Sequence, residues 1–269
     1  METNPGLARS LPERRPLSDT LVVERRYRGF SDIAHGGYVA GALAARLGET
    51  AEVSLLGRVP LERPLAVTRP EPERVLLSDS ARTLAEARPA RLELDIPARV
   101  SIADAEQATA SYPGFPAHLV PGCFCCGPER AVGDGLRIFP GPVAGTRVVA
   151  APWTPHAAFA DADGSVRPEF LWAALDCPQL WALIADARAD SQERVVTAAM
   201  TARIDARVQA GKRHVVVAWP LERSGRTVFA GAALRSEDGD ALVVGQQRAV
   251  FVTGWGVPLG LDRWSTPDS

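Results

Sequence analysis

The order of apolar and polar stretches is the same in the two halves of the chain. In the first half, residues 35–47 are apolar nearly all round, which predicts a helix that its surroundings bury. Pro, Gly and short charged turns separate the strand-like runs that follow it. These runs lie at residues 52–61, 63–70, 73–79 and 81–94. The pattern predicts one helix followed by an antiparallel meander.

The second half repeats this plan with a longer helix. Residues 167–188 predict that helix, and Pro168 falls in its first turn, where a missing N–H costs little. The strand-like runs after it lie at residues 194–208, 213–222, 226–236 and 240–252. Glycine in the turns between the last three runs favours hairpins. Strands are also expected ahead of the helices, at residues 21–29, 135–141 and 146–153.

We therefore predict an α+β protein built from two fused units, each a long central helix wrapped by a curved antiparallel sheet. Two such units can pair edge to edge, which covers two strand edges that would otherwise promote association. The expected boundaries are a disordered N-terminal tail at 1–18, a first unit at 19–112, a linker at 113–122, a second unit at 123–255 and a C-terminal tail at 256–269. A single mixed α+β domain is the alternative.

Composition and charge exclude several classes of function. Apolar residues make up 46% of the 269 residues and charged residues 23%, which suits a folded protein with a sizeable core. The formal net charge of −2 provides no basic footprint for nucleic acid and no polybasic patch for a membrane. The sequence has no apolar run long enough to span a bilayer and no secretory signal, so we expect a cytoplasmic protein.

Two short segments carry candidate chemistry. His35, Gly36 and Gly37 open the first predicted helix, where free N–H groups and the helix dipole suit an anion or a polarised carbonyl oxygen. A helix-entry turn with a surface histidine is the alternative. Asp176 lies within the apolar second helix, and an acid there is costly to bury unless it is paired or used. The alternative is that Asp176 ends one helix just before Pro178 and a second helix follows.

The cysteines carry a weaker signal. Cys123 and Cys126 have the spacing of half a zinc site, but the second half is missing unless His156 or Cys177 is recruited. Together with Cys125 they do not resemble a secreted disulfide framework. We therefore expect buried thiols and no bound metal. The sequence also lacks a G-x-S-x-G elbow and any nucleotide fingerprint after a strand.

Taken together, these segments resemble the hotdog-fold thioesterase superfamily. The similar pieces are His-Gly-Gly at 35–37, the pattern GxVxxxxLxxxLDxxxxxA from Gly164 to Ala182, and the run CFCCGPERAVGDGLRIF at 123–139. The resemblance covers roughly residues 20–255. It implies two hotdog units paired so that the helix start of one unit faces the mid-helix acid of the other.

Carried onto this sequence, the resemblance implies one composite site. The expected catalytic residues are Gly36 as the amide donor to the thioester carbonyl, Asp176 as general base or nucleophile, and Thr197 and His35 beside them. The expected substrate-binding residues are Gly37, Trp172, Leu175 and, as the fallback hydroxyl, Thr201. In the family the acid follows the His by nine residues. Ala44 stands there in the first half, and Arg167, Pro168 and Glu169 replace His-Gly-Gly in the second.

The function that the resemblance implies is hydrolysis of an acyl-CoA or acyl-carrier thioester, a small-molecule partner. No cofactor is expected beyond the CoA of the substrate, and double-hotdog chains are expected to be able to form a homodimer. The alternatives are a hotdog dehydratase or hydratase acting on acyl thioesters, and a non-catalytic acyl-CoA-binding module.

Overall fold

The computed structural model describes residues 19–252 apart from 31, 49, 81 and 187–193. Its strands are β1 Thr20–Val22, β2 Ala51–Leu55, β3 Pro64–Glu71, β4 Arg74–Asp79, β5 Arg82–Pro89, β6 Gly141–Pro142, β7 Val149–Trp153, β8 Arg194–Ile204, β9 His214–Ser224, β10 Thr227–Ser236 and β11 Ala241–Val252. The α-helices are α1 Gly36–Ala44, α2 Ile102–Ala110 and α3 Pro168–Asp186, and short 3-10 helices span Arg25–Tyr27 and Ala157–Phe159. The tails expected at 1–18 and 256–269 lie outside the described residues.

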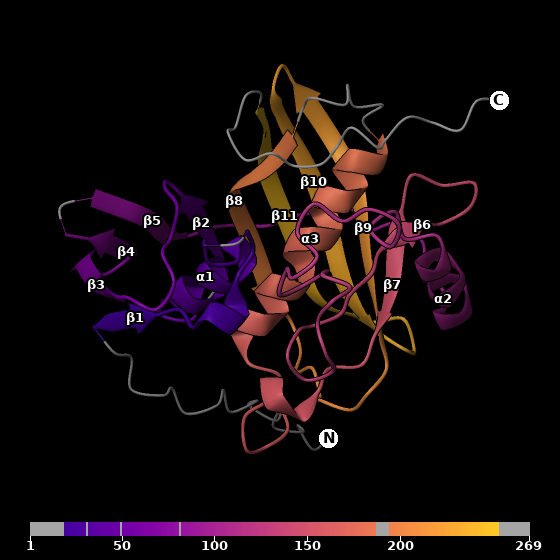
Figure 1. Cartoon of the computed structure of the whole chain (residues 1–269), viewed down its shortest axis with the longest axis horizontal. Helices are drawn as coiled ribbons and strands as arrows, with labels where there is room; N and C mark the ends of the chain where they lie inside the picture. The colour runs from indigo at the N-terminus through magenta and orange to yellow at the C-terminus, as the bar shows by residue number, and fades with distance from the viewer. Residues whose placement is uncertain (1–18, 31, 49, 81, 187–193, 253–269) are drawn as a thin grey trace, which may run out of the picture.

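All described strands form one sheet of 11 strands in the order β1-β3-β4-β5-β2-β8-β11-β10-β9-β7-β6 (Figure 1). Strands from the first half of the chain lie on one side of the β2–β8 pair and strands from the second half on the other. At this junction the strands are antiparallel, with Val53 opposite Met200 and Ala51 opposite Ala202. The α+β class and the continuous antiparallel sheet are therefore confirmed.

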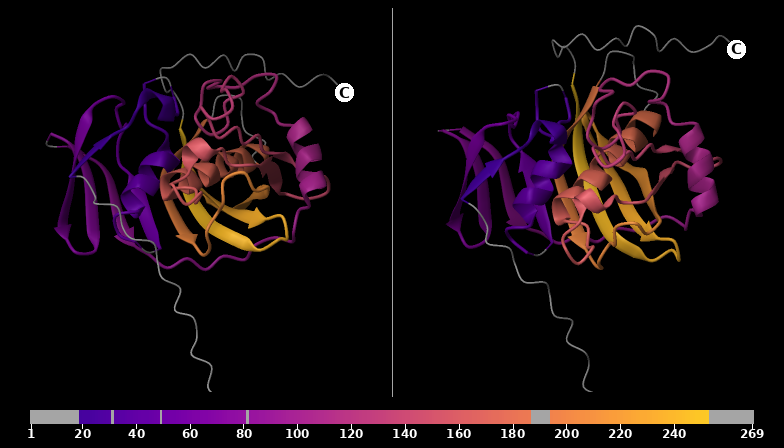
Figure 2. Two further views of the ribbon diagram at one scale, coloured as in Figure 1. Left: turned by 90° about the horizontal axis from the view of Figure 1, so that it is seen from below. Right: turned by 60° about the horizontal axis from the view of Figure 1, so that its bottom comes forward.

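Helices α1 and α3 pack side by side, and the curved sheet wraps around them (Figure 2). They run antiparallel, because Gly37 of α1 faces Ala173 whereas Gly41, one turn later, faces Glu169. The backbones approach closely: a Cβ on Gly41 would lie 2.6 Å from the Glu169 Cα. Glycine at these positions is therefore required by the helix contact and not by a turn.

Helix α3 continues through Pro178 without a break. The alternative in which Asp176 ends a first helix is therefore wrong. A proline inside a helix removes one backbone hydrogen bond and crowds the preceding turn, at a cost of about 3 kcal/mol. The helix is buried along most of its length, and the burial of side chains such as Phe170 and Leu175, both 0% exposed, offsets that cost.

Some predicted strands are shorter or absent. Residues 21–29 form only β1 before a 3-10 helix begins at Arg25. Residues 135–140 form no strand, because their backbone groups bond to the cysteine-containing segment instead of the sheet. There, the N–H of Leu136 donates to the carbonyl of Phe124 and the N–H of Ile138 to that of Cys125. Local pairing with another loop thus replaces sheet pairing.

The sequence patterns did not predict helix α2. Its start carries a capping signal, Ser101-x-x-Asp104, in which the Ser101 hydroxyl oxygen accepts the Asp104 N–H at 3.1 Å. Its buried Ala105 and Ala108 belong to an apolar cluster with Val217 and Trp219 of β9. Side chains on alternate β9 positions face the main core, so α2 covers the opposite face of the sheet. Helix α2, whose residues the sequence assigned to the first unit, therefore covers strands of the second half.

None of the described helices is both long enough and apolar enough to cross a bilayer.

Substituting Gly41 tests the close packing of the helices. Alanine there gains roughly 1 kcal/mol of helix propensity, but its Cβ would overlap the Glu169 backbone. We expect Gly41→Ala to lower the free energy of unfolding by about 1–3 kcal/mol net, as overpacking does. Urea unfolding measures this, with Ala42→Ser on the partly exposed side of α1 as the control. A Gly41→Ala protein as stable as the wild type would contradict the observed helix contact.

Candidate functional site

The start of α1 faces the middle of α3. His35 caps the helix in an extended conformation (φ −64°, ψ 127°), and its Nδ1 accepts the Tyr38 N–H at 3.4 Å. The N–H of Gly37 donates to Asp176 Oδ2 at 2.7 Å. The structure therefore brings together the two segments singled out by sequence. The amide that contacts the acid belongs to Gly37, whereas among the described residues the Gly36 N–H has no acceptor.

The Asp176 carboxylate receives hydrogen bonds from three elements. Besides Gly37, the Thr197 hydroxyl of β8 donates to Oδ1 at 2.8 Å and Gln247 Nε2 of β11 donates to the same oxygen at 2.6 Å. Asp176 is only 3% exposed, so these bonds replace the water that burial removes. All three partners are donors, and an ionised carboxylate is an acceptor alone. The site is thus built to hold a carboxylate anion at the positive end of α1.

Gln247 is the site residue that sequence reasoning missed. It occupies an inward position on β11, where the alternate residues Val243, Gly245, Ala249 and Phe251 are all buried. A polar residue in that apolar alternation is a signal that the sequence does contain. Its Nε2 also donates to Thr197 Oγ1 at 2.9 Å, which closes a triangle with Asp176. Among the described residues its buried Oε1 has no partner.

Gly36 lies at the partly exposed edge of this network. A Cβ on Gly36 would lie 3.2 Å from Asp176 Oδ2, 3.0 Å from Leu55 Cδ1 and 3.8 Å from the Thr197 Cβ. Gly36, Leu55 and Thr197 all retain partial exposure. Because Gly36 has no side chain, partly exposed backbone lies next to the carboxylate, and its N–H has no acceptor among the described residues.

His35 is buried and held on both sides. Its Nδ1 lies 3.5 Å from Asp176 Oδ2 and its Nε2 lies 3.3 Å from Cys177 Sγ. Burial lowers the pKa of His35, but the interaction with Cys123 and the charge of Asp176 outweigh burial, so the pKa lies above its ordinary value. His35 is therefore a support for the helix start and the carboxylate, and at 2% exposure it does not face solvent.

The other expected substrate-binding residues lie in the core. Trp172 packs against α1, where a Cβ on Gly41 would lie 2.8 Å from the Trp172 Cβ. Leu175 packs against β11 beside Gly245. Thr201 is 8% exposed, and its hydroxyl makes no hydrogen bond to Asp176, whereas that of Thr197 does. Trp172, Leu175 and Thr201 are therefore all buried in the interior of the protein.

The pseudo-equivalent position at the other end of α1 lacks these groups. Helix α1 ends at Ala44, and the start of α3 lies nearby with Arg167 and Glu169. The Arg167 guanidinium lies 3.4 Å from the Glu169 carboxylate and over the Phe170 ring at 4.5 Å. No carboxylate–amide pair like that of Asp176 and Gly37 is found there among the described residues.

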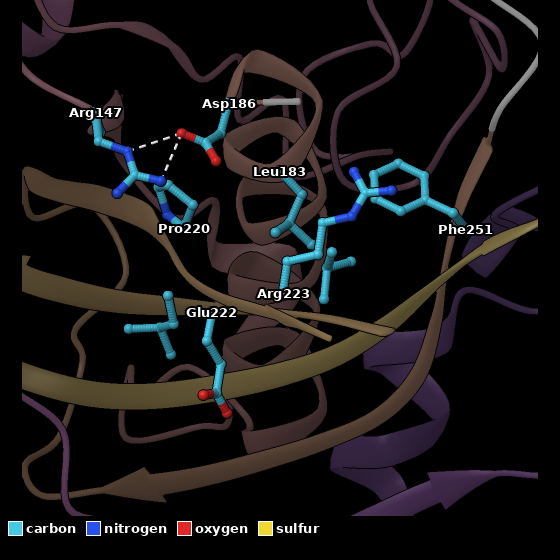
Figure 3. Close-up of a pocket in the computed structure, with 9 residues that line it drawn as sticks. Arg147, Leu183, Asp186, Pro220, Glu222, Arg223 and Phe251 are labelled. Carbon is cyan, nitrogen blue, oxygen red and sulfur yellow. Dashed lines mark hydrogen bonds and ion pairs between the residues drawn. The ribbon is translucent and has the colours of Figure 1, made fainter. Parts of the chain in front are cut away.

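A surface pocket of about 400 Å³ lies at the C-terminal end of α3, away from this network (Figure 3). Leu183 and Phe251 form part of its wall, and Arg223 lies over the Phe251 ring at 4.7 Å. At its edge Arg147 pairs with Asp186 at 2.7 Å. None of the residues bonded to Asp176 lines this pocket, so the pocket is separate from the Asp176 network.

The comparisons with known proteins give similar structures and no similar sequences. No family model and no curated protein sequence matches the chain. Acyl-CoA thioesterase II TesB2 from Mycobacterium marinum is 12% identical, over 88% of this chain and 94% of that chain, with a TM-score of 0.57. A putative thioesterase from Novosphingobium aromaticivorans is 12% identical, over 91% of this chain and 100% of that chain, with a TM-score of 0.58.

A protein of unknown function from Alicyclobacillus acidocaldarius, described as having a hot dog fold, is also similar. It is 13% identical, over 87% of this chain and 93% of that chain, with a TM-score of 0.55. Identities this low establish a shared fold and nothing about activity. The chain has the hotdog fold.

Proposed function

We propose that this chain hydrolyses an acyl-CoA or acyl-carrier thioester at one site between the start of α1 and the middle of α3. The observation that carries the proposal is the carboxylate of Asp176 held by the Gly37 amide at 2.7 Å, beside the partly exposed Gly36 amide. Its similarity to structures named as thioesterases supports the proposal only at the level of fold.

In this proposal Gly36 and Asp176 divide the chemistry. The Gly36 N–H donates to the thioester carbonyl oxygen, and one such donor contributes about 3–4 kcal/mol at a developing oxyanion. A carboxylate offers about four lone-pair positions, and three are occupied at Asp176. The remaining position activates water as a general base or attacks the carbonyl directly.

Thr197 and Gln247 hold the carboxylate in this proposal. Both donate to Oδ1, which leaves Oδ2, the oxygen next to Gly36, as the one that faces the reaction. The unpartnered Oε1 of Gln247 is an acceptor within the same network and suits a positioned water. These two residues are positioning residues, and Asp176 and Gly36 are the catalytic residues.

We further propose that the two halves of the sheet are two fused hotdog units, each contributing one part of the site. The first unit supplies His35–Gly37 and the second supplies Asp176, Thr197 and Gln247. The chain thus has one active site, because Ala44 and Arg167 replace the corresponding acid and histidine.

A dehydratase or hydratase is the second candidate, and the 3.5 Å between His35 Nδ1 and Asp176 Oδ2 favours it. Such an enzyme uses an acid–base pair that faces the substrate. His35 faces Cys177 and the helix start instead, so hydrolysis fits the geometry better. An enoyl-CoA substrate separates the two: hydration consumes the double bond without releasing free thiol.

Replacing Asp176 tests the carboxylate. Asp176→Asn keeps the shape of the side chain but removes its negative charge. It also places a buried amide N–H donor against groups that are themselves donors. We expect kcat/KM for thiol release from a panel of acyl-CoAs to fall about 10²–10⁴-fold, as loss of a general base does. Asp205→Asn, which breaks the exposed Asp205–Arg203 pair, is the control and should retain activity. If acyl-CoA binds equally to wild type and Asp176→Asn and neither protein releases thiol, the chain is an acyl-binding module.

A pair of substitutions at Gly36 isolates the amide donor. Proline is favoured at the first position of a helix, and His35 already has the extended conformation that a following proline requires. Gly36→Ala and Gly36→Pro both add a Cβ, but only proline removes the N–H. We expect the kcat/KM of Gly36→Pro to lie about 10²–10³-fold below that of Gly36→Ala. Equal activities in two folded variants would rule out the Gly36 amide as the oxyanion donor.

A further inference from the structure

Four buried thiols meet where the loop before residue 127 contacts α3. The chain contains four cysteines, all free and buried, three in the loop and one, Cys177, on the helix. The Sγ atoms of Cys123, Cys126 and Cys177 lie within 4.8 Å of one another. We propose that these three cysteines bind one thiophilic metal ion of the Zn²⁺ class as thiolate ligands.

The sulfur spacing matches a tetrahedral site. A Zn–S bond is about 2.3 Å long, so two sulfur ligands of a tetrahedral ion lie roughly 3.8 Å apart. The Sγ atoms of Cys123 and Cys177 lie 3.7 Å apart. A disulfide would require about 2.05 Å. The spacing therefore suits two sulfur ligands of one tetrahedral ion and is too long for a disulfide bond.

The loop orients its two thiols toward the helix. The Cys123 N–H donates to the Val120 carbonyl at 2.8 Å and the Gly127 N–H to the Cys123 carbonyl at 3.0 Å, which makes a tight turn. A Cβ at residue 127 would overlap the Pro121 carbonyl, so only glycine fits there. The Cys-x-x-Cys-Gly sequence thus places both sulfurs on one side of the turn, opposite Cys177.

Two histidines make supporting hydrogen bonds to the sulfur atoms of this cluster. His35 Nε2 lies 3.3 Å from Cys177 Sγ and belongs to a second group with Cys125 and Cys177 within 4.8 Å. Because its Nδ1 accepts the Tyr38 N–H, the neutral His35 ring carries its proton on Nε2 and donates to Cys177 Sγ, as a supporting hydrogen bond to a ligand does. His118 Nδ1 accepts the Val120 N–H at 2.9 Å, so its Nε2 carries a proton and donates to Cys126 Sγ at 3.3 Å.

The surroundings also suit a site with excess negative charge. Three thiolates and a divalent ion carry a net charge of −1, close to the carboxylate of Asp176. Arg130 is buried, its Nε donates to the Gly122 carbonyl next to Cys123 at 2.8 Å, and its Nη2 has no partner among the described residues. Its Nη1 pairs with Asp134 at 2.8 Å, so this guanidinium beside the loop offsets that charge only in part. The three sulfur ligands join the loop to the helix turn that carries Asp176, so we expect a bound ion to stabilise this contact.

Cobalt binding by the full-length chain tests the proposal. The reduced, chelator-treated protein is titrated with Co²⁺, whose thiolate charge-transfer and tetrahedral d–d bands report on the ligands. We expect one Co²⁺ per chain, displacement by Zn²⁺, and a Zn²⁺-dependent rise in Tm. Loss of a partner that only supports a ligand costs roughly 10–100-fold in metal affinity. Cys126→Ser should weaken Co²⁺ binding by more than that, because it removes a ligand. Cys125→Ser, equally buried in the same loop, is the matched control and should keep the charge-transfer band.

Three results would overturn the proposal. The first is a folded wild-type protein with neither a charge-transfer band nor a Tm response to Zn²⁺, a result that requires no variant. The second is equal loss of binding in Cys125→Ser and Cys126→Ser. The third is two titratable thiols in place of four in the unreduced, denatured protein, which would indicate a disulfide between the neighbouring Cys123 and Cys177.

Discussion

The site depends on one buried carboxylate and the donors that compensate for its burial. Asp176 lies on α3, and its partners come from the start of α1, from β8 and from β11. An isolated buried charge would destabilise the fold by several kcal/mol. The helix start, the helix middle and two central strands must therefore keep their relative positions if the carboxylate is to stay satisfied. The group proposed for the chemistry therefore also links the two halves of the chain.

Close contact between the helices makes that arrangement possible. Gly37 and Gly41 let the α1 backbone approach α3, and the two helices run antiparallel. The two ends of this contact differ in chemistry: Gly37 meets the Asp176 side chain at one end, and Gly41 meets the backbone of Glu169, which pairs with Arg167, at the other. The same contact buries Trp172 and the thiols around Cys177, so the carboxylate and the cysteine cluster share one packed layer.

Much of the fold followed from the sequence, because apolar periodicity and turn residues are local signals. The helix at 168–186 and the last three strands lie close to where the apolar pattern predicted them. Helix α2 was not predicted, although Ser101-x-x-Asp104 marks its start. Its apolar stripe is weak, and it packs on a part of the sheet that no local sequence pattern identifies. A strand was predicted at residues 135–140, but their backbone groups bond to the cysteine-containing loop instead of the sheet.

For the site, the sequence alone determined the residue types: glycines opening one helix, an acid inside another, and a Cys-x-x-Cys pair. Only the tertiary structure decided which groups meet. The Gly37 amide, and not that of Gly36, donates to the carboxylate, and the Gly36 N–H has no acceptor in the described part of the chain. Gln247 reaches Asp176 from 71 residues away, and Cys177 lies against Cys123. The physical reason is that residue identity and helix periodicity are local, whereas the partner of a buried polar group is fixed by the packing of elements distant in sequence.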